Sequence, residues 1–515
     1  MPDYAQGPSS RGLEPAMHAS DPHVASSDLA NRTAADLRIE LSGSGTASQR
    51  IVASLLERIE QIDAPDTPTS LRSVLAVSAD AMQQARARDA EQSAGRSRGP
   101  LHGVPVLIKD NIEAIGLPGT AGSLALVGRR VVQDSPIAQR LRDAGAVILG
   151  STNMSEWANF RSPRSTSGWS GVGGLTGNPW ALDRSAGGSS SGSGAAVAAG
   201  LAPLAVGTET NGSITNPASL NGVVGIKATV GAVPTRGVVP ISANQDAPGP
   251  FARTVRDAAM LLEVLSATPG LQAACDADGA RSLRIGVVCG WLTGDTATDT
   301  LFERAVGILE PLVAQTREVV APSADFSVHH DQVSAMVAEF NDDLDAYLAG
   351  RAGEGVRSVG DVVAFNLAHA TQELAHFGQE HFEQALASGG RSADAYREAR
   401  QRNVEWARDA CLGPALATGV DLLIAPAYRP AWKSDLTHGD VLSGGGSVCT
   451  PPAILGWPIL TVPMGLVDGL PVGLSIVGPP HAESSLIAVS HAFERALGMA
   501  ASGAFRPAWR QPERG

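Results

Sequence analysis

Hydrophobic positions in the N-terminal half of the chain alternate between helical and strand-like spacing. Ser48 is predicted to cap a helix, because the apolar residues after it lie on one helical face: Ile51, Val52, Leu55, Leu56, Ile59 and Ile62. Residues 104–108 form an almost unbroken apolar run that ends at Lys109. This pattern is typical of a buried strand that delivers a charged side chain to its end.

The alternation continues towards the middle of the chain. Ser135 followed by Pro136 predicts the start of a helix. Thr254, with Asp257 three residues later, resembles a capping box at the start of another helix, and residues 283–288 are again strand-like. Strands that alternate with helices predict an α/β fold.

The pattern changes between residues 324 and 417, where helices rich in Glu, Gln, His and Ala replace the alternation. We interpret this stretch as a helical insertion, which could act as a lid. Strand-like runs return at residues 422–424 and 459–462, and residues 485–497 have the spacing of a closing helix.

Size and charge limit the possible functions. With 515 residues, the chain can form one very large core or two smaller ones. Hydrophobic residues make up 43% and charged residues 18%, which indicates a compact globular protein. The net charge of −13 and the lack of a Lys/Arg-rich run argue against nucleic acid as a partner.

The ends of the chain and its cysteines bear on location. Residues 1–28 are polar and lack the apolar core of a signal peptide, so we expect a flexible arm. The apolar stretch from Ala195 to Val206 is too short to span a bilayer. The cysteines are too scattered for a disulfide framework or a zinc site: Cys275, Cys289, Cys411 and Cys449. We therefore expect a cytoplasmic protein with reduced thiols and no membrane partner.

Residues 185–200 read SAGGSSSGSGAAVAAG, which would ordinarily indicate a flexible linker. Here the segment runs directly into a small-residue helix and then an apolar strand, residues 204–206. We therefore place the Gly/Ser loop at a helix N-terminus, where free backbone N–H groups can hold a polar or anionic group.

A second loop is predicted at residues 207–213, GTETNGS. Gly212 permits a tight turn that exposes the hydroxyl of Ser213 and points consecutive N–H groups one way, as in an oxyanion hole. An isolated NGS tripeptide is more often a simple turn. A Lys after an apolar strand, such as Lys109, often extends to water. The uncharged residues before it instead predict a desolvated strand end, where burial favours the neutral amine that can act as a base.

These three segments together resemble the amidase signature family. The matches are GVPVLIKD around Lys109, GGSSSGS at residues 187–193 and GTETNGSI at residues 207–214. The resemblance extends over residues 30–500 and includes GWPILTVPMG and GLPVGLSIVG near the C-terminus. It implies a large, mixed, twisted β-sheet flanked by helices on both faces.

The resemblance also implies a domain layout. It places the amidase signature domain at residues 29–505, with a core catalytic segment at 95–265 and the helical insertion at 324–417. Residues 506–515 would form a C-terminal tail.

The resemblance assigns roles to three catalytic residues. Ser213 would be the nucleophile, Ser189 the proton relay on a cis peptide bond, and Lys109 the base. The two serines are 24 residues apart, which is the family spacing and the main reason to choose Ser189 over Ser190 or Ser191. The backbone N–H groups of the oxyanion hole would come from Thr210, Asn211, Gly212 and Ser213. The scheme needs no cofactor, no metal and no histidine, and we interpret His102 as structural.

The chain departs from the usual family pattern at three positions. Thr215 replaces an Arg common two residues after the nucleophile, and Ser191 and Gly194 replace a Gly and an Ala. The subgroup that lacks this Arg, the bacterial peptide amidases, looks most similar. Its likeness lies in SEWANFRS at residues 155–162, PISANQDAPGPFARTV at residues 240–255 and stretches of the insertion, where we expect substrate choice to be determined.

The expected function is hydrolysis of a small-molecule or peptide amide through an acyl-enzyme, with deamidation of C-terminal peptide amides favoured. An aryl or aliphatic amidase or an esterase of the same family remains an alternative, because one sequence does not reveal pocket shape. Further alternatives are a non-catalytic binding homologue and a glutamine-hydrolysing subunit of an amidotransferase. We expect a monomer or homodimer.

Overall fold

The computed structural model describes residues 31–43, 45–64, 70–276, 278–440 and 448–498. The predicted N-terminal arm and C-terminal tail lie outside these residues. The described strands form an eleven-stranded sheet, in the order β1-β3-β2-β8-β10-β9-β14-β15-β13-β11-β12, and two small hairpins, β4-β5 and β6-β7. The strands are β1 Val74–Val77, β2 Pro105–Lys109, β3 Val147–Thr152, β4 Trp169–Ser170, β5 Gly174–Leu175, β6 Gly177–Asn178, β7 Ala181–Ser185, β8 Leu204–Glu209, β9 Val224–Lys227, β10 Ala247–Ala252, β11 Arg284–Val288, β12 Gln315–Val319, β13 Leu422–Pro426, β14 Ile459–Val467 and β15 Leu470–Val477.

The large sheet is mixed. Strand β2 is parallel to both β3 and β8, whereas β10 pairs with β8 and β9 in antiparallel register. Every residue of β2 and β8 is buried, as expected for strands covered on both faces. Because β2 and β8 are parallel neighbours, the segments that follow their carboxyl ends meet at one edge of the sheet.

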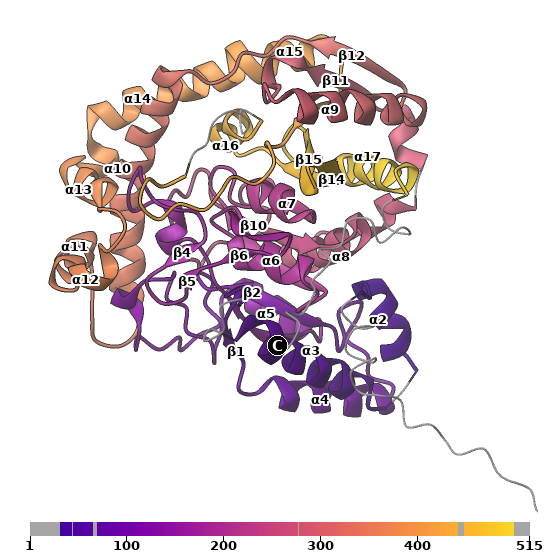
Figure 1. Ribbon diagram of the computed structural model, residues 1–515, viewed down its shortest axis with the longest axis vertical. Helices are drawn as coiled ribbons and strands as arrows, with labels where there is room; N and C mark the ends of the chain where they lie inside the picture. The colour runs from indigo at the N-terminus through magenta and orange to yellow at the C-terminus, as the bar shows by residue number, and fades with distance from the viewer. Residues whose placement is uncertain (1–30, 44, 65–69, 277, 441–447, 499–515) are drawn as a thin grey trace, which may run out of the picture.

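Helices flank the sheet on both faces, so the expected α/β class is confirmed (Figure 1). Helices α6 and α7 pack on each other and on the central strands, while α8 packs on β9, β10 and α17. The helices are α2 Ala34–Leu41, α3 Ala47–Asp63, α4 Ala81–Ser93, α5 Pro136–Asp143, α6 Ser191–Ala198, α7 Thr215–Asn221, α8 Val255–Ser266, α9 Thr296–Leu309, α10 Phe326–Gly350, α11 Val359–Ala368, α12 Ala370–Glu373, α13 Glu380–Ala387, α14 Asp394–Glu405, α15 Gly413–Ala417, α16 Thr450–Leu455 and α17 Glu483–Ala496.

The predicted cap of α3 is wrong. The helix begins at Ala47, one residue before Ser48, and the Ser48 hydroxyl donates to the carbonyl of Gly103 at 3.1 Å. The carboxylate of Asp89, from α4, instead accepts the N–H groups of Ser48 and Gln49 at 2.9 and 3.0 Å. A carboxylate from another helix therefore replaces the local cap.

The predicted capping box of α8 forms only in part. The Thr254 hydroxyl accepts the N–H of Asp257 at 3.2 Å, as expected. The Asp257 carboxylate does not return to the Thr254 backbone. It accepts the N–H groups of Ala34 and Ala35, at 2.8 and 3.0 Å, and so caps α2. By contrast, the Ser135 hydroxyl caps α5 as predicted, by accepting the N–H of Ala138 at 3.2 Å.

The helices predicted at residues 324–417 are present, as α10 to α15, and are called the insertion below. The 25-residue helix α10 packs against α13 and α14, and this group lies along one side of the molecule (orange in Figure 1). A hydrophobic cluster separate from the main core joins the insertion to the segment around Trp157, whose ring meets Phe382 edge-on at 5.7 Å. The insertion therefore shares a core with the catalytic half of the chain.

The described helices and cysteines bear on partners and thiols. None of the described helices combines the length and apolarity needed to cross a membrane. All four cysteines lie within the described ranges and are free thiols.

Candidate active site

Lys109 is the last residue of β2 and is completely buried. Its Nζ lies 2.8 Å from Ser189 Oγ, 2.9 Å from Thr208 Oγ1 and 3.3 Å from the Thr208 carbonyl oxygen. Asn111 donates from Nδ2 to the same Thr208 hydroxyl at 3.0 Å. Three oxygen atoms thus fix the amine at the end of the strand, as the apolar run before Lys109 predicts.

Ser189 is the serine of the Gly/Ser loop that contacts Lys109. The peptide bond between Gly188 and Ser189 is cis, as the family resemblance implies. The hydroxyl of Ser190 is bonded to β8 instead, donating to the Thr208 carbonyl at 3.0 Å and accepting the Thr208 N–H at 3.2 Å. The Ser191 hydroxyl donates to the Gly187 carbonyl at 2.5 Å. The neighbouring serines are therefore occupied by backbone groups.

Ser213 lies in the turn after β8, which extends to Glu209, so the predicted loop is shorter than expected. Gly212 has a φ of +87°, and a Cβ at this position would lie 2.6 Å from the Tyr428 hydroxyl. This turn therefore requires glycine. Within the described part of the chain, no protein group accepts the N–H groups of Asn211, Gly212 and Ser213, whereas the N–H groups of the next two residues both donate to Glu209.

Burial dominates the electrostatics of Lys109. It lowers the pKa of Lys109 to about 7, against the opposing effect of the negative charges of Asp246 and Glu209. Burial also raises the pKa of Asp246 to about 6, although Asp246 accepts the Thr210 hydroxyl at 2.5 Å and two backbone N–H groups. At neutral pH a large fraction of Lys109 is thus the neutral amine, which has a lone pair for the Ser189 proton.

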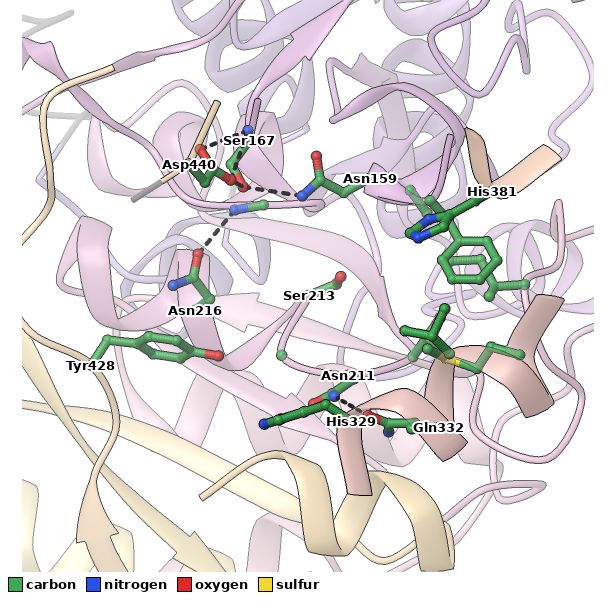
Figure 2. A pocket seen from close by; sticks show the side chains of 18 residues that line it. Asn159, Ser167, Asn211, Ser213, Asn216, His329, Gln332, His381, Tyr428 and Asp440 are labelled. Carbon is green, nitrogen blue, oxygen red and sulfur yellow. Dashed lines mark hydrogen bonds between the residues drawn. The ribbon is translucent and has the colours of Figure 1, made fainter. Parts of the chain in front are cut away.

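A cavity of about 290 Å³ opens over Ser213, and Figure 2 shows the Ser213 hydroxyl pointing into it. Core segments and the insertion both contribute to its wall. The lining residues are Ala158, Asn159, Phe160, Ser167, Gly188, Thr210, Asn211, Gly212, Ser213, Asn216 and Ile241 from the core, His329, Gln332, Val333, Met336 and His381 from the insertion, and Tyr428 and Asp440 from the segment after β13.

His102 and Thr215, the other positions considered in the sequence, form hydrogen bonds outside the cavity. His102 accepts the Arg98 N–H on Nδ1 at 3.2 Å, and its Nε2 lies 2.9 Å from the Arg88 carbonyl, away from the cavity. Its structural interpretation is therefore supported. The Thr215 hydroxyl donates to Glu209 at 3.0 Å and so stabilises the turn.

Sequence reasoning missed several cavity residues. Gln332 and His329 come from the first turns of α10, and Tyr428 and Asp440 follow β13. None of these four lies in a motif that we could associate with chemistry. Other cavity residues lie in stretches that resemble the peptide amidases: Asn159 and Phe160 in SEWANFRS, Ile241 in PISANQDAPGPFARTV, and His381 in the insertion.

The fold and this site define an enzyme of the amidase class. The chain belongs to the amidase family, since the family described as Amidase matches residues 50–487. Among solved structures, it is similar to the peptide amidase of Stenotrophomonas maltophilia, at 39% identity and a TM-score of 0.83, over 90% of this chain and 97% of that chain. A peptide amidase in complex with the competitive inhibitor chymostatin is 41% identical over the same shares, with a TM-score of 0.84.

Relatives of known sequence fall into two groups. A probable amidase of Arabidopsis thaliana is 35% identical over 90% of both chains. A glutamyl-tRNA(Gln) amidotransferase subunit of Symbiobacterium thermophilum is 36% identical over 89% of this chain and 95% of the relative. The family is therefore certain from sequence, whereas these identities alone do not separate the two kinds of relative.

Proposed function

We propose that the protein hydrolyses the C-terminal amide of peptides, with Ser213 as nucleophile, Ser189 as proton relay and Lys109 as base. The observation that carries this proposal is the 2.8 Å contact between Lys109 Nζ and Ser189 Oγ in a fully buried setting. This contact places the neutral amine of Lys109 next to the Ser189 hydroxyl, at the edge of the cavity into which the Ser213 hydroxyl points.

The first half of the reaction forms an ester. Ser213 Oγ attacks the amide carbon while its proton passes to Ser189, whose own proton moves to the Lys109 amine. The hydroxyls of Ser189 and Ser213 are not hydrogen-bonded to each other in the described structure, and such contacts often tighten only when substrate binds. The free N–H groups of Asn211, Gly212 and Ser213 hold the oxyanion, each worth on the order of 3–4 kcal/mol. Thr210 is the fourth residue of this proposed hole.

The second half releases both products. The proton held by Lys109 returns through Ser189 to the leaving nitrogen, so that ammonia departs and Ser213 carries the acyl group. A water molecule then attacks the ester carbon and gives its proton to the same relay. The ester bond breaks, Ser213 regains its proton, and the product leaves as a carboxylic acid that ionises.

The charge of the cavity favours a peptide amide over free glutamine. The described residues of its wall include no Lys or Arg, and Asp440 contributes a carboxylate. Free glutamine carries an α-carboxylate as well as an α-ammonium group, and binding sites usually hold the carboxylate with a cation, whereas Asp440 could pair only with the ammonium. A peptide amide has no such charge near the scissile bond. The likeness to two peptide amidase structures supports the same choice.

A substrate panel tests the proposal. The leaving group is measured for each substrate, as ammonia from acetylated peptide amides, short aliphatic amides and glutamine, aniline from anilides and alcohol from alkyl esters, with Ser213→Ala as the blank. We expect the highest kcat/KM for peptide amides, with no cleavage at internal peptide bonds. Faster turnover of glutamine than of any peptide amide would contradict the proposal and favour the amidotransferase-like alternative.

A further inference from the structure

A second cavity, of about 790 Å³, lies directly beside the reaction cavity. We call it the distal groove. It lies among α10, α13 and α14 of the insertion and shares three wall residues with the reaction cavity: His329, Val333 and His381. The two cavities are therefore adjacent, with these three side chains between them.

Most of the surface of the distal groove is apolar, although seven of its fourteen wall residues are polar, among them His330. The wall includes Val333, Val337 and Ala338, and Phe326 at its edge is 84% exposed. None of the described wall residues is Lys, Arg, Asp or Glu. Burial lowers the pKa of His329 and of His381, so both imidazoles are neutral at pH 7. An exposed aromatic ring beside an apolar hollow is typical of a binding surface.

We propose that the distal groove binds an apolar stretch of the peptide that precedes the C-terminal amide. This inference rests on the proposed function. With about 290 Å³, the reaction cavity is at the lower limit for small-ligand sites, so a peptide held at Ser213 must extend beyond it. The distal groove is the adjacent space, since it shares three wall residues with the reaction cavity. The substrate class is therefore a peptide amide with apolar residues upstream.

Two substitutions would narrow the groove and place a charge in it without touching Ser213. Ser334 is half-buried on α10, and Ala387 is exposed at the end of α13; both line the groove. The variants are Ser334→Arg and Ala387→Arg. The matched control is Leu386→Arg, because Leu386 is adjacent on α13, 47% exposed and outside the groove wall.

The substrates are acetylated alanine peptide amides of increasing length, in which one upstream residue is Leu, Glu or Lys. For each enzyme, kcat/KM for the long Leu peptide is divided by kcat/KM for acetyl-alanine amide. Burial of a leucine side chain stabilises a complex by about 1.5–3 kcal/mol. The ratio for the native enzyme should therefore exceed about tenfold with the Leu peptide, and this preference should be lost when the upstream residue is Glu or Lys. The ratio should fall about tenfold in Ser334→Arg and in Ala387→Arg, and stay at the native value in Leu386→Arg.

An equal ratio in all four proteins would overturn the inference. So would a change of sedimentation coefficient in the two groove variants without a change of ratio, because the groove would then be an interface between copies of the chain.

Calorimetric binding of the long Leu peptide to Ser213→Ala, with and without Ser334→Arg, separates this test from turnover. Binding that is lost with Ser334→Arg supports the groove even if no peptide amide is hydrolysed. The absence of any hydrolysis would refute only the proposed function.

Discussion

The pH dependence of kcat/KM should follow the protonation of Lys109. The base must be neutral to accept the Ser189 proton, and burial lowers the pKa of Lys109 to about 7. Below that pH the rate should fall by a factor of about ten per unit, so that kcat/KM at pH 5 is about one hundredth of its plateau. The assay is ammonia release from a peptide amide at low substrate concentration between pH 5 and 9, with circular dichroism to verify folding at each pH.

The lowered pKa of Lys109 also predicts an effect on stability, which can be measured independently of activity. Between pH 7 and the ordinary Lys pKa of 10.5, the unfolded chain binds more protons at this position than the folded protein. The contribution of Lys109 to the free energy of unfolding therefore rises with pH. From pH 7 to pH 9 the rise is about 2 kcal/mol. Replacement by methionine, Lys109→Met, removes this pH-dependent contribution.

Urea unfolding of the native protein and of Lys109→Met at both pH values isolates this effect. All other titrating groups cancel in the difference between the two proteins. The native protein should gain about 2 kcal/mol relative to the variant between pH 7 and pH 9. A difference that stays constant, together with a kcat/KM that is flat down to pH 5, would refute the assignment of a neutral Lys109 as base.

Three further substitutions test the site and the fold. Ser213→Ala should lower kcat by more than about a thousandfold at an unchanged melting temperature, and near-native turnover would exclude Ser213 as nucleophile. Gly212→Ala should lower kcat at least about tenfold, because the turn needs a positive φ and the new Cβ would meet Tyr428; native kinetics would argue against the proposed oxyanion hole. Asp257→Ala leaves the N–H of Ala34 without its acceptor and should cost about 1–2 kcal/mol in urea unfolding at pH 7.5, whereas no loss would show that the cap is dispensable.

The sequence predicted the strand that carries Lys109 because a buried strand has a local signature. An apolar run that ends in a charged residue is visible without any tertiary information. Ser189 could not be chosen in this way, because local sequence patterns do not distinguish three consecutive serines. The structure distinguishes the serines by their hydrogen-bond partners: the Ser190 hydroxyl bonds to the backbone of β8, and the Ser191 hydroxyl to its own loop. The sequence could resolve this only through the spacing of a known family.

Caps and cavity walls were less predictable for a common reason. The rule for Ser48 assumes that a helix N-terminus is satisfied by its nearest polar side chain, but a carboxylate 41 residues away takes that place. In the sheet β13 lies beside β15, and this order of strands brings Tyr428, just after β13, to the turn at Gly212. No local pattern in the sequence encodes this order. Residues brought together by the topology of the sheet cannot be found from spacing along the chain.

The motif SEWANFRS shows why the insertion cannot be treated as a separate lid. Its Arg161 is fully buried, with Nε 3.2 Å from Glu156 of the same motif and Nη1 3.6 Å from Glu373 of α12 in the insertion. Burial raises the pKa of Glu156 well above its ordinary value, and the charge of Arg161 opposes that rise. The guanidinium contacts one carboxylate from each part of the chain, so the buried charge of Arg161 has opposite charges beside it.

The join has a consequence for the reaction cavity. Phe160, which precedes Arg161, lines the cavity and packs against His381 of the insertion, with ring centroids 4.9 Å apart and ring planes tilted by 34°. A segment that contributes to the cavity wall on the core side thus also anchors the insertion. Because the guanidinium also lies over the Phe377 ring at 4.3 Å, the insertion is held by packing and charge together. The insertion and a segment that lines the reaction cavity are therefore joined by this buried contact, in addition to the packing of Trp157 on Phe382.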